Sequence, residues 1–139
     1  AAPAPSRDRA ATFLLVLLAL LLRLLVATGP HSGQSTPPQY GDFEAQRHWM
    51  AVTVSLPPID WYRETPRNNL TYWGLDYPPL SGWHSRLLGA FLAEVDYEAA
   101  EAQSRGVETR EVKLFMRAAV LMSDLVVFIP AALGFLKAA

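Results

Sequence analysis

The amino-acid sequence predicts an all-α membrane protein in which two transmembrane helices flank one long polar loop. Apolar residues make up 51% of the 139-residue chain, and they concentrate in two runs, residues 12–27 and 118–136. Long apolar runs of this kind are typical of membrane-spanning helices rather than of a globular core. The residues between the two runs are polar and aromatic, and we expect them to lie outside the membrane.

Composition excludes some classes of function. The formal net charge of -1 provides no electrostatic basis for binding nucleic acid. The chain has no cysteine, so it has neither a disulfide framework nor a thiolate site. The redox environment of the protein therefore does not follow from its composition.

The first apolar segment, residues 10–27, follows a short basic N-terminus. Eighteen helical residues extend about 27 Å, close to the ~30 Å thickness of the hydrocarbon core. A cleaved signal peptide is the alternative, with Ala27-Thr28-Gly29 as a small-residue cleavage site. The length of the run and the presence of a second run favour a retained transmembrane helix, preceded by a cytosolic N-terminus at residues 1–9.

The second apolar segment, residues 118–136, contains Pro130 and Gly134, which membrane helices tolerate. A buried core helix is the alternative, but a chain this short offers little else to bury it. Two spans place the loop, residues 28–117, on one side of the membrane and both ends on the other. The positive-inside tendency then assigns residues 137–139 to the cytosol together with the N-terminus.

Each predicted span carries one charged residue in its interior, Arg23 in the first and Asp124 in the second. Counted from the loop side, their depths differ by only about 3 Å at 1.5 Å per residue. An isolated charge inside a membrane is costly, so we expect the two to form an ion pair. The alternative is that Arg23 extends to the membrane surface while Asp124 faces another helix.

A first loop helix is predicted from Asp42 to about Val54, where Pro57 and Pro58 stop it. Asp42 occupies the position of a helix N-cap. A second helix begins at Pro79, which suits the first helical position. Its apolar residues recur at helical spacing: Leu80, Trp83, Leu87, Leu88, Phe91, Leu92 and Val95. We expect this stripe to lie in the membrane interface or to pack on the spans.

Two further features lie between these helices. Trp61 and Tyr62 form an aromatic pair of the kind that often lies at a membrane interface. Asn69-Leu70-Thr71 matches the sequence for N-glycosylation, provided that the loop is lumenal.

The chemistry that the loop suggests is carried by carboxylates beside aromatic rings. The three histidines, His31, His48 and His84, lie in separate elements and have no metal-ligand spacing. Asp42, Glu44 and Asp76 lie near Trp and Tyr residues, a combination that suits sugar chemistry, because an acid can take a hydroxyl proton while rings cover the apolar sugar face. The structural alternatives are that Asp42 only caps its helix and that Asp76 only forms a turn.

Several runs carry a resemblance to a known family: residues 31–34, 40–50, 68–80, 104–106 and 113–117. They resemble the endoplasmic-reticulum glucosyltransferases that use dolichyl-phosphate glucose, in particular the member that adds the first glucose, in α-1,3 linkage, to the high-mannose lipid-linked oligosaccharide of protein N-glycosylation. The resemblance extends from about residue 31 to 136.

The resemblance implies a GT-C glycosyltransferase fold in the endoplasmic-reticulum membrane, with the catalytic acid in a first lumenal loop that carries interfacial helices. Asp42 matches that acid and would act as general base in an inverting transfer. No metal or other cofactor is implied, and the expected partners are the lipid-linked donor and acceptor. Substrate-binding roles are expected for Glu44, Arg47, His48, Trp49, Trp73, Asp76 and Tyr77.

Two departures and two alternatives accompany the resemblance. Relatives carry an acid after His-Trp-Met, whereas this chain has Ala51. Members of the family are also much longer, so we expect the chain to be an N-terminal part that is inactive alone. The alternatives are the sibling enzyme that adds the second glucose and a non-catalytic, membrane-anchored binding or scaffolding protein.

Overall fold

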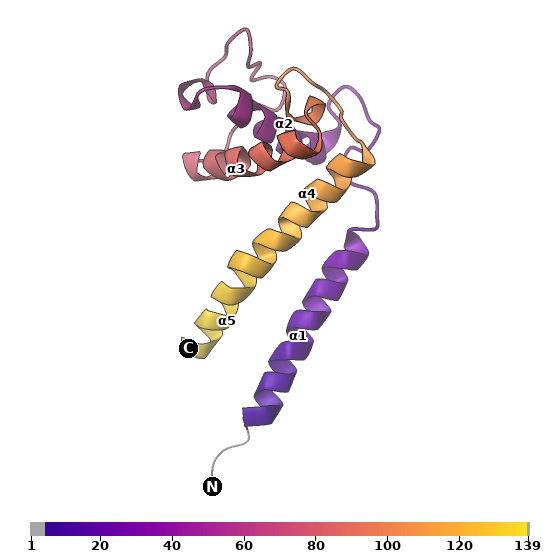
Figure 1. Ribbon diagram of the computed structural model, residues 1–139, viewed down its shortest axis with the longest axis vertical. Helices are drawn as coiled ribbons and strands as arrows, with labels where there is room; N and C mark the ends of the chain where they lie inside the picture. The colour runs from indigo at the N-terminus through magenta and orange to yellow at the C-terminus, as the bar shows by residue number, and fades with distance from the viewer. Residues whose placement is uncertain (1–4, 139) are drawn as a thin grey trace. The chain divides into compact units, whose positions relative to one another are not determined.

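The computed structural model describes residues 5–138, and within this range every regular element is helical, which confirms the all-α prediction (Figure 1). The long helices are α1 (Pro5–Val26), α2 (Gly41–Ser55), α3 (Pro79–Val95), α4 (Arg110–Ser123) and α5 (Ile129–Ala138). The chain divides into two units: Ala1–Pro30 with Arg117–Ala139, and His31–Met116. Of the predicted cytosolic ends, residues 1–4 and 139 lie outside the described range.

Two helical stretches are long and apolar enough to cross a membrane. Arg9–Val26 lies in the first unit, and Arg110–Leu136 begins in the second unit and continues through the first. Both extend beyond the predicted limits. Helix α1 begins at Pro5 instead of residue 10, and α4 begins at Arg110, eight residues before the predicted start of the second span. From Phe13 to Val26 and from Val120 to Leu136 most large apolar side chains are exposed, as expected for surfaces that face lipid.

The second stretch changes its helical geometry around Pro130. A π-helical segment, η3 (Asp124–Phe128), joins α4 to α5. Pro130 has no N–H to donate to the carbonyl of Val126, four residues earlier, and its ring crowds that carbonyl. A wider helical turn accommodates both effects, and for this reason the helix continues past the proline without a break.

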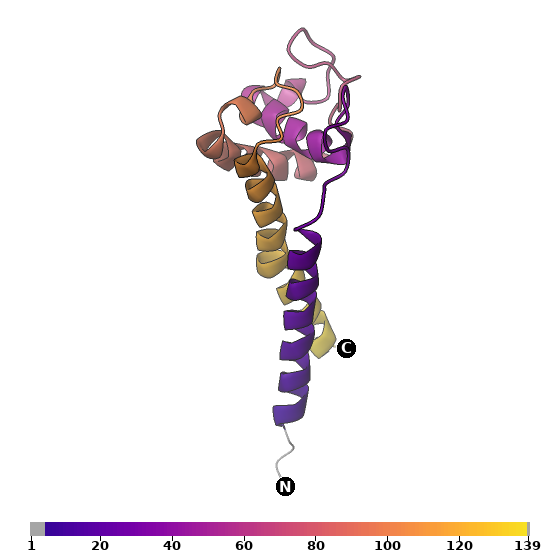
Figure 2. The same cartoon turned by 90° about the vertical axis from the view of Figure 1, so that its right-hand side faces the viewer.

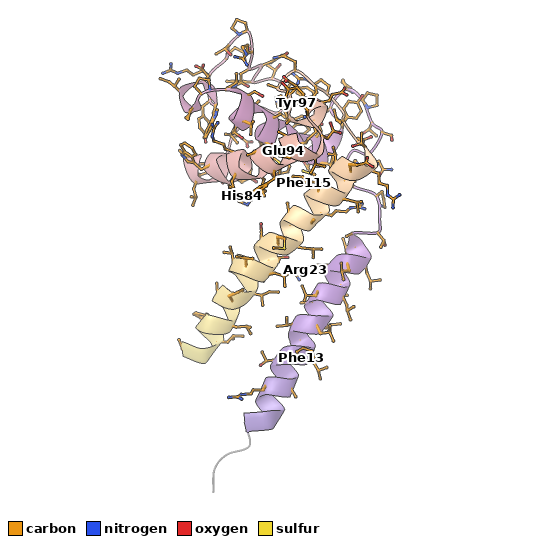
Figure 3. All side chains as sticks on the ribbon, viewed as in Figure 1. Phe13, Arg23, His84, Glu94, Tyr97 and Phe115 are labelled. Atoms are coloured by element: carbon orange, nitrogen blue, oxygen red, sulfur yellow. The ribbon has the colours of Figure 1, made fainter. Side chains whose placement is uncertain are left out.

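Arg23 and Asp124 form an ion pair within the first unit, in which Nε of Arg23 donates to Oδ2 of Asp124. Arg23 projects from α1 (Figure 3), and its guanidinium also donates to the carbonyl of Ala19 at 3.2 Å and lies 6.0 Å from the ring centre of Phe128. Near the end of α1, Arg117 donates to the carbonyl of Gly29 at 2.5 Å. The Arg23–Asp124 pair links the two apolar stretches to each other, and the Arg117–Gly29 bond links the second stretch to the turn that follows α1.

Reversing one charge of this pair is expected to destabilise the protein in a bilayer, and reversing both is expected to restore it. Arg23→Asp or Asp124→Arg alone places two like charges next to each other among apolar side chains, at a cost of at least about 3 kcal/mol. Unfolding in nanodiscs measures the effect. A charge-swapped double variant no more stable than either single variant would show that the pair contributes nothing.

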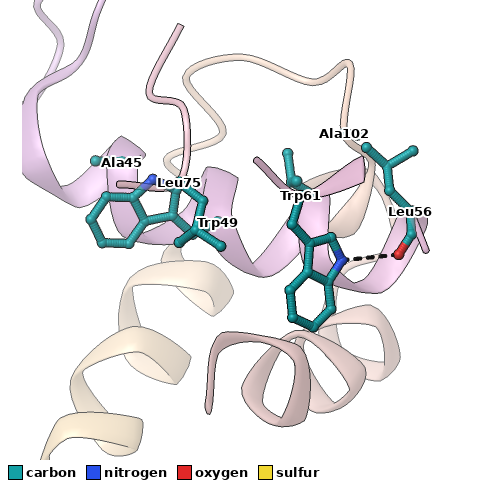
Figure 4. Packing of buried hydrophobic residues seen from close by; sticks show 7 residues of the cluster. Ala45, Trp49, Leu56, Trp61, Leu75 and Ala102 are labelled. Atoms are coloured by element: carbon teal, nitrogen blue, oxygen red, sulfur yellow. Dashed lines mark hydrogen bonds between the residues drawn. The ribbon is translucent and has the colours of Figure 1, made fainter. Parts of the chain in front are cut away.

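Helix α2 is the core of the second unit, with nine of its fifteen residues buried. One apolar cluster packs on one side of it (Figure 4): Ala45, Trp49, Val52, Leu56, Trp61, Leu75 and Ala102. A second cluster packs on another side: Met50, Leu92, Ala99, Ala100, Val112 and Met116. The short 3₁₀ helices η1 (Pro58–Asp60) and η2 (Glu98–Ala100) connect these elements.

Helix α3 begins at Pro79 as predicted and lies against α2 (Figure 1 and Figure 2). A small residue of α3 makes the closest contact. At Gly89 an added Cβ would lie only 2.6 Å from the carbonyl oxygen of Met50, so this close approach requires glycine. Most of the large residues of the predicted stripe lie on other faces of the helix. Leu80 is 82% exposed and Phe91 is 59% exposed, whereas Leu92 is buried. The stripe is therefore split, and most of it is an outer surface of the unit.

The expectation for Trp61 at a membrane interface is wrong. Its indole is 1% exposed, its Nε1 donates to the carbonyl of Leu56 at 3.0 Å, and its ring packs edge-on against Trp83. The chain turns at η1, and the ring of Trp61 then packs against α3 at Gly82, where the absence of a side chain leaves room for it. Tyr62, its neighbour, remains exposed and donates to the carbonyl of Tyr77 at 2.9 Å.

Candidate active site

Asp42 is the second residue of α2 and is exposed. The N-cap is Tyr40, in a left-handed conformation and without a side-chain capping bond, so the expectation that Asp42 caps the helix is wrong. Its carboxylate instead accepts a hydrogen bond from the hydroxyl of Ser32 at 3.2 Å, and its backbone N–H donates to the same hydroxyl oxygen at 3.4 Å. The side chain at the head of α2 is therefore tied to the preceding loop.

Two glycines allow this loop to approach the start of α2 closely. Gly33 and Gly41 both have positive φ, at 71° and 66°. An added Cβ on Gly33 would lie 2.2 Å from the backbone nitrogen of Gly41, so only glycine fits where the two segments meet. Tyr40, between them in sequence, places its ring against Gly106.

Glu108 binds the same loop at Ser35. The backbone N–H of Ser35 donates to both oxygens of Glu108, at 3.2 and 3.0 Å. Nε2 of His31 lies 3.3 Å from Oε1 of Glu108 but outside hydrogen-bonding geometry, and the His31 ring stacks on Phe43 at 4.0 Å. The loop therefore has a defined position on the unit.

Glu44 and Arg47, one helical turn apart, form a fully buried ion pair. Two guanidinium nitrogens of Arg47 donate to the two carboxylate oxygens of Glu44, each at 2.7 Å. Arg47 also donates to the carbonyls of Ala99 and Ser104 and to the Ser104 hydroxyl. Such paired and fully hydrogen-bonded geometry is what a buried charge requires. This network ties α2 to the segment that leads to α4.

Tyr72 and His48 complete the network. The hydroxyl of Tyr72 donates to Glu44 at 2.9 Å, and burial together with this hydrogen bond raises the pKa of Tyr72, so the phenol stays protonated. His48 packs edge-on against Tyr72 and has no hydrogen-bond partner among residues 5–138. Burial, and then the positive charges of Arg105 and Arg47, lower the pKa of His48 to about 3, so its ring is neutral at neutral pH.

Arg105 lies at the edge of this network, with its guanidinium stacked on the ring of Tyr72 at 4.0 Å. One of its nitrogens, Nη1, donates to the carbonyls of Ala102 and Ser104, each at 2.8 Å. Burial lowers the pKa of Arg105. Sequence reasoning assigned no role to Arg105, Tyr72 or Ser32, although all three lie within the runs that carry the family resemblance.

A second group is aromatic. Nε1 of Trp49 donates to the carbonyl of Trp73 at 2.8 Å, and the Trp49 ring packs edge-on against Tyr77 at 5.2 Å. Trp73 has a positive φ of 48°, and its Nε1 donates to the carbonyl of Gln39 at 2.6 Å. Trp73 is half-buried, whereas Asp76 and Tyr77 are exposed. These contacts bring the 73–77 segment to the chain that enters α2.

The structure thus sorts the predicted site residues by exposure. Four of the predicted substrate-binding residues are buried: Glu44, Arg47, His48 and Trp49. The others have exposed or half-buried side chains: Asp42, Trp73, Asp76 and Tyr77. The arrangement offers a solvent-accessible carboxylate at the start of a packed helix, and the 73–77 segment, which bonds to Gln39 ahead of that helix, offers accessible aromatic surface. Such a carboxylate can accept a proton, and such rings can cover a sugar face.

Fold and site together define a helical protein with two membrane-length apolar helices and a packed unit, His31–Met116, that presents an exposed carboxylate and accessible aromatic residues. The model of the ALG6, ALG8 glycosyltransferase family matches residues 17–139, and the chain belongs to this family. The family resemblance seen in the sequence is therefore confirmed.

Curated relatives share about half of their aligned residues with this chain. It is 54% identical over 120 residues to the probable dolichyl pyrophosphate Man9GlcNAc2 alpha-1,3-glucosyltransferase of Arabidopsis thaliana, covering 86% of this chain and 22% of the relative. It is 52% identical over 119 residues to the dolichyl pyrophosphate Man9GlcNAc2 alpha-1,3-glucosyltransferase of Gallus gallus, covering 84% of this chain and 23% of the relative. It is 50% identical over 121 residues to the Mus musculus protein of the same name, covering 85% of this chain and 24% of the relative. The chain spans about a quarter of the length of these relatives.

Proposed function

We propose that this chain supplies the catalytic base of a glucosyltransferase that adds glucose, in α-1,3 linkage, to the terminal mannose of dolichyl-diphosphate-linked Man9GlcNAc2. The observation that carries the proposal is the relatives' identity of 50 to 54%, since each bears the name of this activity. The proposed donor is dolichyl-phosphate glucose, and the proposed chemistry uses no cofactor.

Asp42 is the proposed general base. Its carboxylate removes the proton from the 3-hydroxyl of the terminal mannose as that oxygen attacks the anomeric carbon of the glucose. The new glycosidic bond forms while the bond between that carbon and the phosphate oxygen breaks, and dolichyl phosphate leaves with the electron pair. Attack opposite the leaving group converts a β-linked donor into an α-linked product. The exposure of Asp42 supports this role, because a base must reach its substrate.

The exposed and buried residues of the site have different proposed roles. Trp73, Asp76 and Tyr77 have accessible surface, and we assign them to contact with the sugars or the phosphate. We assign a supporting role beneath the binding surface, in place of direct substrate contact, to the four buried residues Glu44, Arg47, His48 and Trp49. Their side chains already pack against or bond to protein groups. Such buried support holds a site in its productive geometry.

The proposed setting is a GT-C fold in the endoplasmic-reticulum membrane, with the His31–Met116 unit in the lumen. The apolar outer residues of α3 support a position at the membrane interface, with large side chains such as Leu80, Trp83 and Phe91 facing the lipid. Asn69 of the glycosylation sequence is exposed, which suits a lumenal loop. Labelling that placed this unit on the cytosolic side would contradict the setting.

A full-length transferase that carries residues 17–139 of this chain as its matching segment tests the function. In proteoliposomes with dolichyl-phosphate glucose and a lipid-linked Man9GlcNAc2 acceptor, we expect one glucose per acceptor, in α-1,3 linkage. The parent transferase without the replacement is the control. An inactive replacement beside an active parent would contradict the proposal, and transfer only to an acceptor that already carries one glucose would identify the sibling enzyme instead.

A further inference from the structure

The contact between Ser32 and Asp42 has a chemical consequence for the base. We propose that Ser32 is a positioning residue that holds the Asp42 carboxylate in its reactive orientation, an inference that rests on the proposed function of Asp42. Ser32 lies ten residues before Asp42, in the loop that precedes α2, and its hydroxyl contacts both the side chain and the backbone of Asp42.

An exposed aspartate at a helix start has several accessible rotamers, and most of them point a carboxylate oxygen away from a given substrate atom. The hydroxyl of Ser32 selects among them, because it donates to Oδ2 at 3.2 Å while its oxygen accepts from the Asp42 backbone N–H at 3.4 Å. That N–H is one of the groups at a helix start that have no partner within the helix. One hydroxyl thereby links the main chain of Asp42 to its own carboxylate.

The second carboxylate oxygen, Oδ1, accepts no hydrogen bond from any part of the chain that the structure describes. With Oδ2 engaged by Ser32, Oδ1 is the atom left to receive a proton from the acceptor hydroxyl. The position of this atom matters for the rate, since a misplacement of about 1 Å can reduce catalysis about a hundredfold.

The loop that carries Ser32 is held by further contacts, which support a defined position for the Ser32 hydroxyl next to Asp42. Gly33 is pressed against Gly41, and the hydroxyl of Thr36 donates to the carbonyl of Gly33 at 2.6 Å. The next turn of the loop is tied to Glu108 through the N–H of Ser35. These bonds place Ser32 at a fixed distance from the head of α2.

Three variants of the full-length transferase test the proposal. We expect Ser32→Ala to lower kcat at least about tenfold, with KM for donor and acceptor changed by less than about twofold, because only the orientation of the base is lost. Ser32→Thr keeps the hydroxyl and should recover most of kcat. Ser35→Ala removes a hydroxyl from the same loop that donates to no described group, and it should leave the kinetics unchanged.

Two outcomes would overturn the positioning role: a kcat of Ser32→Ala within about twofold of the unchanged transferase, or a loss that Ser32→Thr fails to restore. If Ser32→Ala lowers the thermal midpoint, Ser32→Cys is used instead, because it has a similar shape and a much weaker donor; full kcat in that variant also overturns the role. Failure of the proposed function is recognised separately, by an Asp42→Asn variant that still transfers glucose.

Discussion

Asp42→Asn is expected to reduce glucose transfer by the full-length transferase at least about a thousandfold. The amide has the shape of the carboxylate but cannot accept the proton of the attacking hydroxyl, and general-base catalysis contributes about 10² to 10⁴ in rate. The fold should be unaffected, because Asp42 is exposed and the hydroxyl of Ser32 can donate to the amide oxygen in place of the carboxylate. Initial rates at saturating donor and acceptor measure the effect.

Asp60→Asn is the matched control, since it makes the same chemical change at a carboxylate that forms no hydrogen bond or ion pair within the described residues. It should transfer glucose at the normal rate. A near-normal rate for Asp42→Asn would instead support the alternative in which this chain is a non-catalytic, membrane-anchored binding protein. The result therefore separates a catalytic carboxylate from a structural one.

Arg47→Met is expected to lower the free energy of unfolding by about 3–5 kcal/mol, because it leaves the buried carboxylate of Glu44 without its counter-charge. Both side chains are at most 1% exposed, so water cannot replace the lost partner. The change also removes the bonds from Arg47 to Ala99 and Ser104, which hold the segment between α3 and α4. Chemical unfolding of the chain in detergent, followed by tryptophan fluorescence, measures the loss.

The double variant Glu44→Gln with Arg47→Met should be more stable than Arg47→Met alone, because no unpaired charge is then buried. Arg63→Met is the matched control: Arg63 is exposed and its guanidinium has no partner in the described range, so a change of less than about 0.5 kcal/mol is expected. A loss below about 1 kcal/mol for Arg47→Met would mean that the pair is not needed for the fold.

Local signals in the sequence were sufficient for the helices. Apolar length predicts α1 and the stretch from α4 to α5, and helical periodicity with Pro79 at the first position predicts α3, since these signals lie within the element itself. The limits of the second span differ from the predicted ones. The second span begins at Arg110 and contains the π-helical segment η3, because the first turns of α4 pack in the core of the His31–Met116 unit and Pro130 alters the helix further along.

The residue types of the site were also predictable, but their roles depend on contacts between distant parts of the chain. Asp42, Glu44 and Asp76 were singled out together as carboxylates near aromatic rings. Only the packing separates them: Glu44 lies beneath the surface with Arg47 and Tyr72, whereas Asp42 and Asp76 are exposed. Burial of a charge depends on what covers it, and Ser104, one of the groups that meet Arg47, lies 57 residues further along the chain.

The sequence by itself determined the class of fold, the apolar helices and the family, because each rests on patterns of neighbouring residues. The tertiary structure decided which face of α3 packs inward, since Gly89 permits a close approach to α2 and Gly82 leaves room for the ring of Trp61. Most of the large apolar residues of α3 consequently face outward. The tertiary structure also decided that Ser32 meets Asp42, because that contact depends on the path of the loop between them and on the two glycines that bring it back to the head of the helix.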